Sequence, residues 1–349
     1  MIRVLIVGTG VMAHDHAKAF AAMDDVTIVA GVDPNAERLA AFTSAYDIPN
    51  GFASVEDAIV WGAFDAASNV TPDAIHHRTT LPLLTAGKHV LCEKPLATNH
   101  HDAIEMGRAA TAAGVVNMVN LTYRNVPALM QAAQLVQEGQ IGEVRHFEAS
   151  YLQSWLTQDA WGDWRSQDAW LWRLSQAHGS MGVLGDVGVH IVDFATYAAG
   201  SDPDRVSCRL KTFDKADGGQ IAGYTLDAND SVAMHLSLRN GAIGVIHASR
   251  FASGHINDLH LRLYGTKGGL DVRFAGWESQ LLICTGDNLR SANWTTVDPE
   301  PVISNFRRFI AAIKTGQAVS PDFARGAALQ HVLDMAVASD KAGACDQII

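Results

Sequence analysis

Residues 4–13 of the 349-residue chain read VLIVGTGVMA, and this stretch decides the fold of the first half. The apolar run 4–7 predicts a buried strand, and the glycine-rich turn after it leads into a segment with helical spacing. In the pattern G-x-G-x-x-A the first glycine permits a tight turn, the second lets backbone approach a pyrophosphate, and the small third residue lets the helix lie close to the sheet. The backbone of Gly8, Gly10, Val11 and Met12 is therefore predicted to bind a dinucleotide at a helix N-terminus.

Asp33 closes the second apolar run, 25 residues after Gly8. A carboxylate at this place can accept hydrogen bonds from the adenosine ribose hydroxyls and repels a 2′-phosphate. The cofactor predicted from Asp33 is NAD rather than NADP. As an alternative, Asp33 is a helix N-cap or turn residue before Pro34, and the two roles are compatible.

The two halves of the chain differ in their hydrophobic pattern. Short β-branched runs alternate with alanine-rich helical stretches as far as about residue 120, which predicts a doubly wound parallel sheet with helices on both faces. From residue 144 the apolar residues alternate in period two, with turns at 239–242 and 265–269, which predicts an antiparallel sheet. We expect an α/β chain with a Rossmann domain over 1–123 and a second α/β domain over 124–349, whose C-terminal helices pack back on the first.

Composition excludes several classes of protein. The chain has 37 acidic and 26 basic residues and a net charge of −11, which argues against a nucleic-acid partner. Four widely separated cysteines indicate neither a zinc site nor a disulfide framework, so a cytoplasmic location is expected. The N-terminal apolar run is too short for a signal peptide, and no stretch of about 18 apolar residues predicts a membrane span.

Residues 70–97 carry a more specific signal and read VTPDAIHHRTTLPLLTAGKHVLCEKPLA. With His16, Arg124, and the segments 139–144, 185–193 and 265–268, this stretch resembles the glucose–fructose oxidoreductase / inositol dehydrogenase / rhizopine catabolism (Gfo/Idh/MocA) family. The resemblance implies a Rossmann domain, then an α/β domain whose large, mostly antiparallel open sheet often forms a subunit interface. It also implies a nicotinamide cofactor, redox chemistry on a carbohydrate or polyol, and a homodimer or homotetramer. The residues that it places in the cofactor site are Thr71, Pro72, His76, Glu93 and Lys94.

Lys94 follows a predicted parallel strand, at the sheet edge where open α/β sheets bind their ligands. A lysine there can hydrogen-bond the reacting oxygen and stabilise negative charge that develops on it. The alternative is an ordinary surface lysine after a strand, which the Glu93-Lys94-Pro95 pattern disfavours.

Asp186, His190 and Asp193 have the spacing i, i+4, i+7, which places them on one face of a helix. By the resemblance, Asp186 and His190 match the active-site aspartate and histidine of the family. Because neutral imidazole can accept a hydroxyl proton near neutral pH, we predict His190 as the base, with Asp186 orienting substrate or imidazole and Lys94 binding the oxygen. A capping or surface pair and a metal site are the alternatives; no further ligand cluster is evident, so no metal is expected.

Five of the eight tryptophans fall within residues 155–172, interleaved with arginines. Aromatic faces pack on sugar rings and arginine binds hydroxyl groups, so a substrate wall is one interpretation. The other is that the tryptophans pack the domain core or a subunit interface, and the arginines equally suit an acidic substrate. The residues predicted to contact substrate are Arg124, Trp155, Trp164, Arg165 and Arg173.

Together these features predict an NAD(P)-dependent oxidoreductase that transfers hydride between the cofactor and a hydroxyl carbon of a sugar, inositol or related polyol. Two alternatives share the fold: an NAD-dependent glycoside hydrolase and a cofactor-binding regulator without catalysis. The three predicted catalytic residues argue against the regulator, because a sensor has no need of proton transfer.

Overall fold

The computed structural model describes residues 1–349, apart from the side chains of residues 168 and 169. The chain divides into two compact units, and each is made of separate stretches. The first unit comprises Met1–Leu121 and Ile303–Gln330, and the second comprises Thr122–Val302 and His331–Ile349. The helix α10 (Phe323–Lys341) therefore contributes residues to both.

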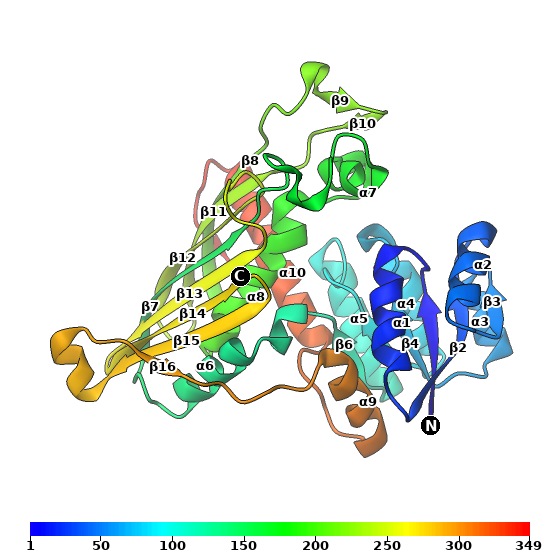
Figure 1. Cartoon of the computed structure of the whole chain (residues 1–349), viewed down its shortest axis with the longest axis horizontal. Helices are drawn as coiled ribbons and strands as arrows, with labels where there is room; N and C mark the ends of the chain where they lie inside the picture. The colour runs from blue at the N-terminus through cyan, green and yellow to red at the C-terminus, as the bar shows by residue number, and fades with distance from the viewer. The chain divides into compact units, whose positions relative to one another are not determined.

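The first unit contains a six-stranded parallel sheet with the strand order β3-β2-β1-β4-β5-β6. Figure 1 shows its strands and helices in blue and cyan, with α9 in orange. The strands are β1 (Ile2–Val7), β2 (Val26–Val32), β3 (Asn50–Phe52), β4 (Ala66–Asn69), β5 (His89–Cys92) and β6 (Asn117–Val119). The helices are α1 (Val11–Ala21), α2 (Ala36–Ala45), α3 (Val55–Trp61), the 3₁₀ turn η1 (Asp73–Ile75), α4 (His76–Thr85), α5 (His100–Ala113) and α9 (Asn305–Thr315).

The strand order of this sheet indicates where the unit would bind a ligand. The order reverses between β1 and β4, and such a switch point is where doubly wound sheets bind ligands, outside the carboxyl ends of their strands. The continuous apolar run 4–7 is completely buried because helices cover both faces of a parallel sheet. The turn after β1 and the loops after β4 and β5 therefore meet at one edge of the sheet.

The second unit contains a nine-stranded mixed sheet with the order β16-β15-β14-β13-β7-β12-β11-β8-β17, in which only the pair β7–β12 is parallel. Its main strands are β7 (Val144–Leu152), β8 (Pro203–Lys211), β11 (Ser231–Leu238), β12 (Ile243–Ser249), β13 (Asp258–Gly265), β14 (Gly268–Ala275) and β15 (Glu278–Thr285). Short strands complete it at β16 (Thr295–Val297) and β17 (Gln347–Ile348), and a separate hairpin joins β9 (Gln220–Ile221) to β10 (Tyr224–Thr225). Alternate residues of β11 and β12 are buried, as the period-two pattern predicts.

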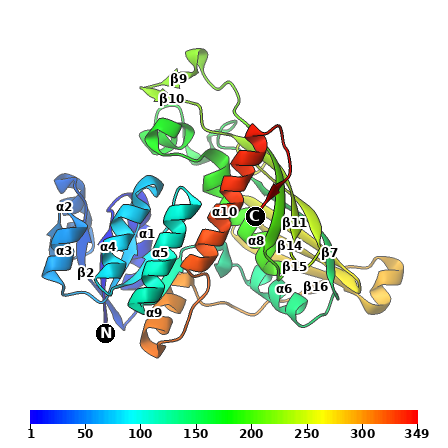
Figure 2. The ribbon, with the colours of Figure 1, turned by 180° about the vertical axis from the view of Figure 1, so that it is seen from behind.

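Helices cover one face of this sheet, where α6 (Pro127–Gln137) and α8 (Val189–Ala198) contact its strands (Figure 2). The predicted fold class, a Rossmann sheet followed by a mostly antiparallel sheet, is confirmed. Both predicted turns join neighbouring strands, β11 to β12 and β13 to β14.

One local prediction is wrong in detail. The segment 184–193 is not one regular α-helix, because Leu184–Gly188 forms a π-helical turn that leads into α8. Glycines permit this geometry: Gly182 has φ +67°, and a Cβ on Gly185 would lie 2.3 Å from the Cβ of Met181. The i, i+4, i+7 spacing therefore spans two kinds of helix, since Asp186 lies in the π turn and His190 and Asp193 lie in α8.

No helix of the described residues combines the length and apolar character needed to cross a bilayer. All four cysteines are free, and Cys92, Cys208 and Cys284 are buried.

We expect Phe309→Ala to destabilise the first unit by about 3–5 kcal/mol, because Phe309 on α9 is completely buried in the cluster that contains Phe20 and Leu91. Urea unfolding followed by circular dichroism measures the effect. Ile303→Ala, at an exposed position of the same chain segment, is the matched control and should change stability by less than about 0.5 kcal/mol. Equal effects of the two substitutions would contradict the placement of α9 in this core.

Candidate active site

The glycine turn after β1 leaves space for an anion. Gly8 has φ +88°, and a Cβ there would lie 2.8 Å from the carbonyl oxygen of Val70, so only glycine fits. A Cβ on Gly10, by contrast, would meet nothing within 4 Å. Gly10 is the N-cap of α1 without a side-chain cap, and Val11 is 77% exposed. The first amides of α1 thus suit a pyrophosphate, as the predicted pattern requires.

Asp33 fixes this turn to the end of β2. Its Oδ2 accepts hydrogen bonds from the backbone N–H of Thr9 (3.0 Å) and the hydroxyl of Thr9 (2.9 Å), and its Oδ1 accepts one from the backbone N–H of Asn35 (2.9 Å). The turn role weighed from the sequence is therefore present, whereas the N-cap of α2 is Asn35. Each carboxylate oxygen can accept more than one hydrogen bond, so capacity for ribose hydroxyls remains.

Glu93 lies inside a buried polar network, and both of its oxygens have protein partners. Its Oε1 accepts a hydrogen bond from the amide of Asn120 (2.6 Å) and lies 2.9 Å from Nε2 of His16, while its Oε2 accepts one from the backbone N–H of Lys94 (3.2 Å). The network continues from His16 to Ser68 and from Asn120 to Asn305 of α9. Burial raises the pKa of Glu93, but His16, the Lys94 ammonium and Asn120 outweigh it and lower the pKa to about 2. Glu93 thus fixes the loop of Lys94 through the hydrogen bond from the Lys94 backbone N–H.

The loop after β4 is fixed in a similar way. Asn69 accepts hydrogen bonds from the backbone N–H (3.2 Å) and the hydroxyl (2.8 Å) of Thr71, which positions Thr71 and Pro72 at the sheet edge. His76 is completely buried and bonds the loops after β4 and β5. Lys94 is half-buried, and the Lys94–Pro95 peptide bond is cis. The family-derived cofactor residues therefore lie together at the carboxyl ends of β4 and β5.

In the second unit the π turn and α8 carry Asp186 and His190. The ring of Tyr123 packs edge-on against His190 at 4.9 Å between centroids, and its hydroxyl takes part in a hydrogen-bonded group with Tyr151 and Asn257. Burial raises the pKa of Tyr151 well above its usual value, and Tyr123 and Asp186 add to this rise. The Tyr151 phenol near His190 therefore stays neutral.

Arg250 is a residue that the sequence reasoning missed. It follows β12, is completely buried, and donates from Nη2 to Oδ2 of Asp186 at 2.9 Å and from Nη1 to the carbonyl of Arg173 at 3.1 Å. Burial lowers the pKa of Arg250, and Asp186 opposes this shift. Nε of Arg173 lies 3.8 Å from the same carboxylate oxygen. Asp186 thus has two guanidinium groups beside it. Because Asp186 and Arg250 are 64 residues apart in the sequence, no short-range spacing predicts this pair.

Arg124 has a structural partner rather than an open position. Its Nε and Nη2 donate to the two oxygens of Asp193 at 2.6 and 2.8 Å, and both residues are buried. Its guanidinium also stacks on the ring of Tyr197 at 3.3 Å. This bidentate pair ties the start of the unit to α8 and favours a structural role for Arg124 over the predicted substrate contact.

The predicted tryptophan residues lie in a hydrophobic cluster. Trp155 and Trp164 are each only 2% exposed and pack with Leu171, Leu174 and Leu226. Such burial favours the packing interpretation of this segment. The indole N–H of Trp155 donates to Gln153 (3.2 Å), and the guanidinium of Arg250 lies over the Trp155 ring at 5.0 Å. Two arginines stack at the border of the cluster, Arg165 on Trp164 at 4.4 Å and Arg173 on Trp172 at 4.8 Å.

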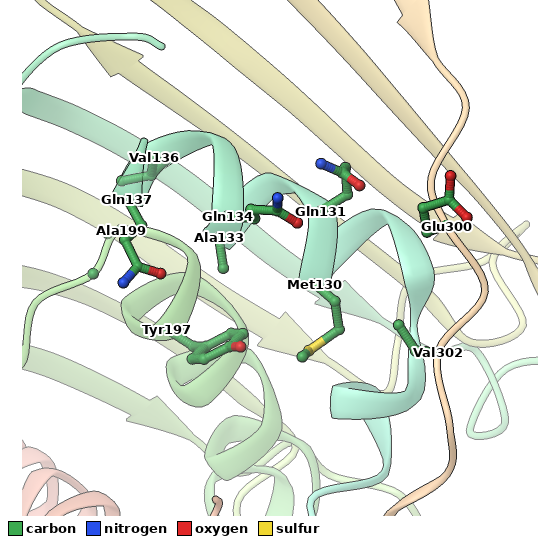
Figure 3. A pocket seen from close by; sticks show the side chains of 11 residues that line it. Met130, Gln131, Ala133, Gln134, Val136, Gln137, Tyr197, Ala199, Glu300 and Val302 are labelled. Atoms are coloured by element: carbon green, nitrogen blue, oxygen red, sulfur yellow. The ribbon is translucent and has the colours of Figure 1, made fainter. Parts of the chain in front are cut away.

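A cavity of about 760 Å³ lies on α6 and the end of α8, and the Tyr197 ring on which Arg124 stacks is part of its lining (Figure 3). The side chains that line it are mostly uncharged, with glutamines on α6 and Tyr197 on α8. None of the predicted site residues lines it. Elsewhere, His77, Asp102 and Glu105 form a group with metal-ligand chemistry on α4 and α5, in which His77 and Glu105 already pair at 2.9 Å.

Comparison with known proteins gives two matches to models of one family. Residues 2–121 match the oxidoreductase family with an NAD-binding Rossmann fold, and residues 129–271 match the GFO/IDH/MocA C-terminal domain. Levoglucosan dehydrogenase of Pseudarthrobacter phenanthrenivorans is 26% identical over 97% of this chain and 96% of that protein, and inositol 2-dehydrogenase of Rhizobium meliloti has the same identity and coverage. A solved structure of levoglucosan dehydrogenase in complex with NADH superposes with a TM-score of 0.88 at 25% identity, covering 100% of this chain and 99% of that one.

We expect Arg124→Met to destabilise the second unit by about 3–5 kcal/mol, because it leaves the buried Asp193 carboxylate without its bidentate partner. Urea unfolding at pH 7 measures this loss. Arg145→Met removes an arginine of an exposed pair with Glu143 and serves as the control, with an expected change below about 1 kcal/mol. A stability loss at Arg124 no larger than that of the control would show that the pair has no structural role.

Proposed function

We propose a reaction for this chain on the premise that it belongs to the Gfo/Idh/MocA family of oxidoreductases. The enzyme transfers hydride between a nicotinamide cofactor and a hydroxyl carbon of a sugar, inositol or related polyol. The observation that carries this proposal is the loop of Lys94, which Glu93 holds at the carboxyl end of β5 in the same unit as the open glycine turn. Relatives named for levoglucosan and inositol support a cyclic, polyhydroxylated substrate.

All residues proposed to bind the cofactor lie in the first unit. The backbone of Gly8, Gly10, Val11 and Met12 would hold the pyrophosphate, and Asp33 would accept hydrogen bonds from the adenosine ribose. Thr71 and Pro72, fixed by Asn69, would border the cofactor on the neighbouring loop. The Asp33 carboxylate disfavours a 2′-phosphate, so NAD is preferred over NADP. NAD, when bound, accepts the hydride from the carbon that is oxidised.

Proton transfer, charge stabilisation and substrate orientation are proposed for side chains of both units. His190 accepts the hydroxyl proton at its imidazole as the C–H bond breaks, and it returns this proton in the direction of reduction. The Lys94 ammonium hydrogen-bonds the reacting oxygen and stabilises the negative charge that develops there. Asp186, oriented by Arg250, accepts a hydrogen bond from substrate or from the imidazole. Arg165 and Arg173 are the proposed contacts to outlying hydroxyl groups, since Trp155 and Trp164 are covered.

A homodimer or homotetramer in the cytoplasm completes the proposal. The open face of the nine-stranded sheet supports association, because strands such as β11 and β12 keep alternate side chains exposed. Four free cysteines support a reducing compartment.

The direct test is a screen of sugars and polyols with NAD and NADP, followed at the NADH absorbance. A panel member that is oxidised with NAD supports the proposal. Cleavage of an aryl glycoside without net NADH would instead identify a glycoside hydrolase, and NAD-dependent binding of a partner without turnover would identify a regulator.

Gly10→Ala should weaken NADH binding by at least about tenfold without loss of stability. The added Cβ meets no protein atom, and it occupies the space through which backbone approaches the pyrophosphate. Titration of NADH fluorescence measures the dissociation constant. Gly107→Ala, in α5, is the control, because a Cβ there makes only ordinary contacts at 3.9 Å. Unchanged NADH affinity in Gly10→Ala would place the cofactor elsewhere.

Lys94→Ala should reduce kcat by about a thousandfold, within the range found for removal of a single group that stabilises developing negative charge. NADH affinity should change little, since the pyrophosphate and ribose contacts remain. Stopped-flow assays and NADH titration separate the two effects. Lys88→Ala, which removes the half-buried lysine just before β5, is the control. Full turnover in Lys94→Ala would remove Lys94 from the mechanism.

A further inference from the structure

His76 begins α4 and is completely buried in the first unit. Each of its ring nitrogens lies at hydrogen-bond distance from a backbone carbonyl oxygen. Nδ1 is 2.8 Å from the oxygen of Pro95, after β5, and Nε2 is 2.8 Å from the oxygen of Thr71, after β4. One side chain therefore contacts both loops that contribute residues to the proposed cofactor site.

The chemistry of the two contacts determines the charge of the ring. A carbonyl oxygen only accepts hydrogen bonds, and a neutral imidazole has a single N–H to donate. In either neutral tautomer, one nitrogen lone pair would face one carbonyl lone pair at 2.8 Å. Only the imidazolium, with an N–H on both nitrogens, makes two hydrogen bonds here.

The surroundings of the ring favour the charged form. The titratable groups that face it are Cys92, from β5, and Asp73, from η1. Burial lowers the pKa of His76, but Cys92, the Asp73 carboxylate and the Pro95 carbonyl outweigh burial and raise the pKa to about 10. The two carbonyl oxygens at 2.8 Å and the Asp73 carboxylate thus offset the cost of burying a charge.

We propose that His76 is a positioning residue, held as an imidazolium, which clasps the Lys94–Pro95 loop to the Thr71–Pro72 loop. Its two hydrogen bonds set the distance between these loops, and Glu93 accepts a further hydrogen bond from the Lys94 backbone N–H. His76 does not take part in the chemical step, because both of its nitrogens are engaged with backbone. The charge state concerns the first unit alone, whereas the effect on turnover rests on the proposed function.

Nitrogen-15 NMR of histidine-labelled protein tests the charge directly. We expect one ring whose two nitrogens both keep imidazolium chemical shifts up to at least pH 9, and this signal pair should vanish in His76→Gln and in His76→Asn. The ring of His101, whose side chain is 88% exposed, serves as the internal reference for a histidine in contact with solvent. A neutral-tautomer pattern for His76 at pH 8 would overturn the proposal. If the wild-type spectrum shows no doubly protonated ring at that pH, this result overturns the proposal without any variant.

Kinetics test the positioning role. Glutamine can donate to one carbonyl only, so His76→Gln should lower kcat by about tenfold to a hundredfold through misplacement of Lys94, with a smaller change in NADH affinity. His77→Gln, at the neighbouring, more exposed histidine, is the matched control and should leave kcat unchanged. Wild-type kcat in His76→Gln would refute the role even if the NMR result holds. Absence of turnover in the wild type would refute the proposed function, and the NMR result would still decide the charge of His76.

Discussion

The buried carboxylate of Glu93 is the interaction on which the first unit depends. It joins His16 of α1, Asn120 after β6 and the Lys94 backbone after β5, and the network reaches Ser68 on β4 and Asn305 on α9. A buried charge is stable only when hydrogen bonds and opposite charges compensate it, so these elements must keep their places for the carboxylate to stay ionised. A single requirement of charge compensation thereby fixes the proposed reactive lysine to the body of the sheet.

The same requirement explains why the cofactor residues of the sequence pattern divide into two kinds. Gly8, Gly10 and the first turn of α1 offer backbone and open space. Glu93 and His76 are instead occupied by protein groups and act by holding the loops that carry Lys94 and Thr71. The sequence motif contains both kinds of residue and does not distinguish them. A residue that contacts a ligand and a residue that holds the neighbouring backbone both belong to the same pattern.

Local rules predicted most of the fold. The glycine turn, the apolar strands of the first unit and the period-two strands of the second each reflect hydrogen bonding or burial within a few residues. The π turn at Leu184–Gly188 was not predictable in this way, because Asn229, 45 residues beyond Leu184, accepts a hydrogen bond from the Leu184 N–H and donates one to the carbonyl of Met181. Arg250 was missed for the same reason, since its partner Asp186 lies on a different element. Burial of Trp155 and Trp164 depends on leucines up to 71 residues away, so composition alone left two interpretations open.

Charge pairing in the second unit also bears on how an imidazole can serve as a base. Carboxylates close to an imidazole favour its protonated form, and a protonated ring cannot accept a proton. The segment of His190 carries two carboxylates, and each faces a guanidinium: Asp193 is bonded by Arg124, and Asp186 by Arg250 with Arg173 nearby. The aromatic neighbours Tyr123 and Tyr151 add no charge. On the proposed role of His190 as base, the buried Arg124 and Arg250 compensate the two carboxylates that would otherwise favour a protonated ring, in a protein of net charge −11.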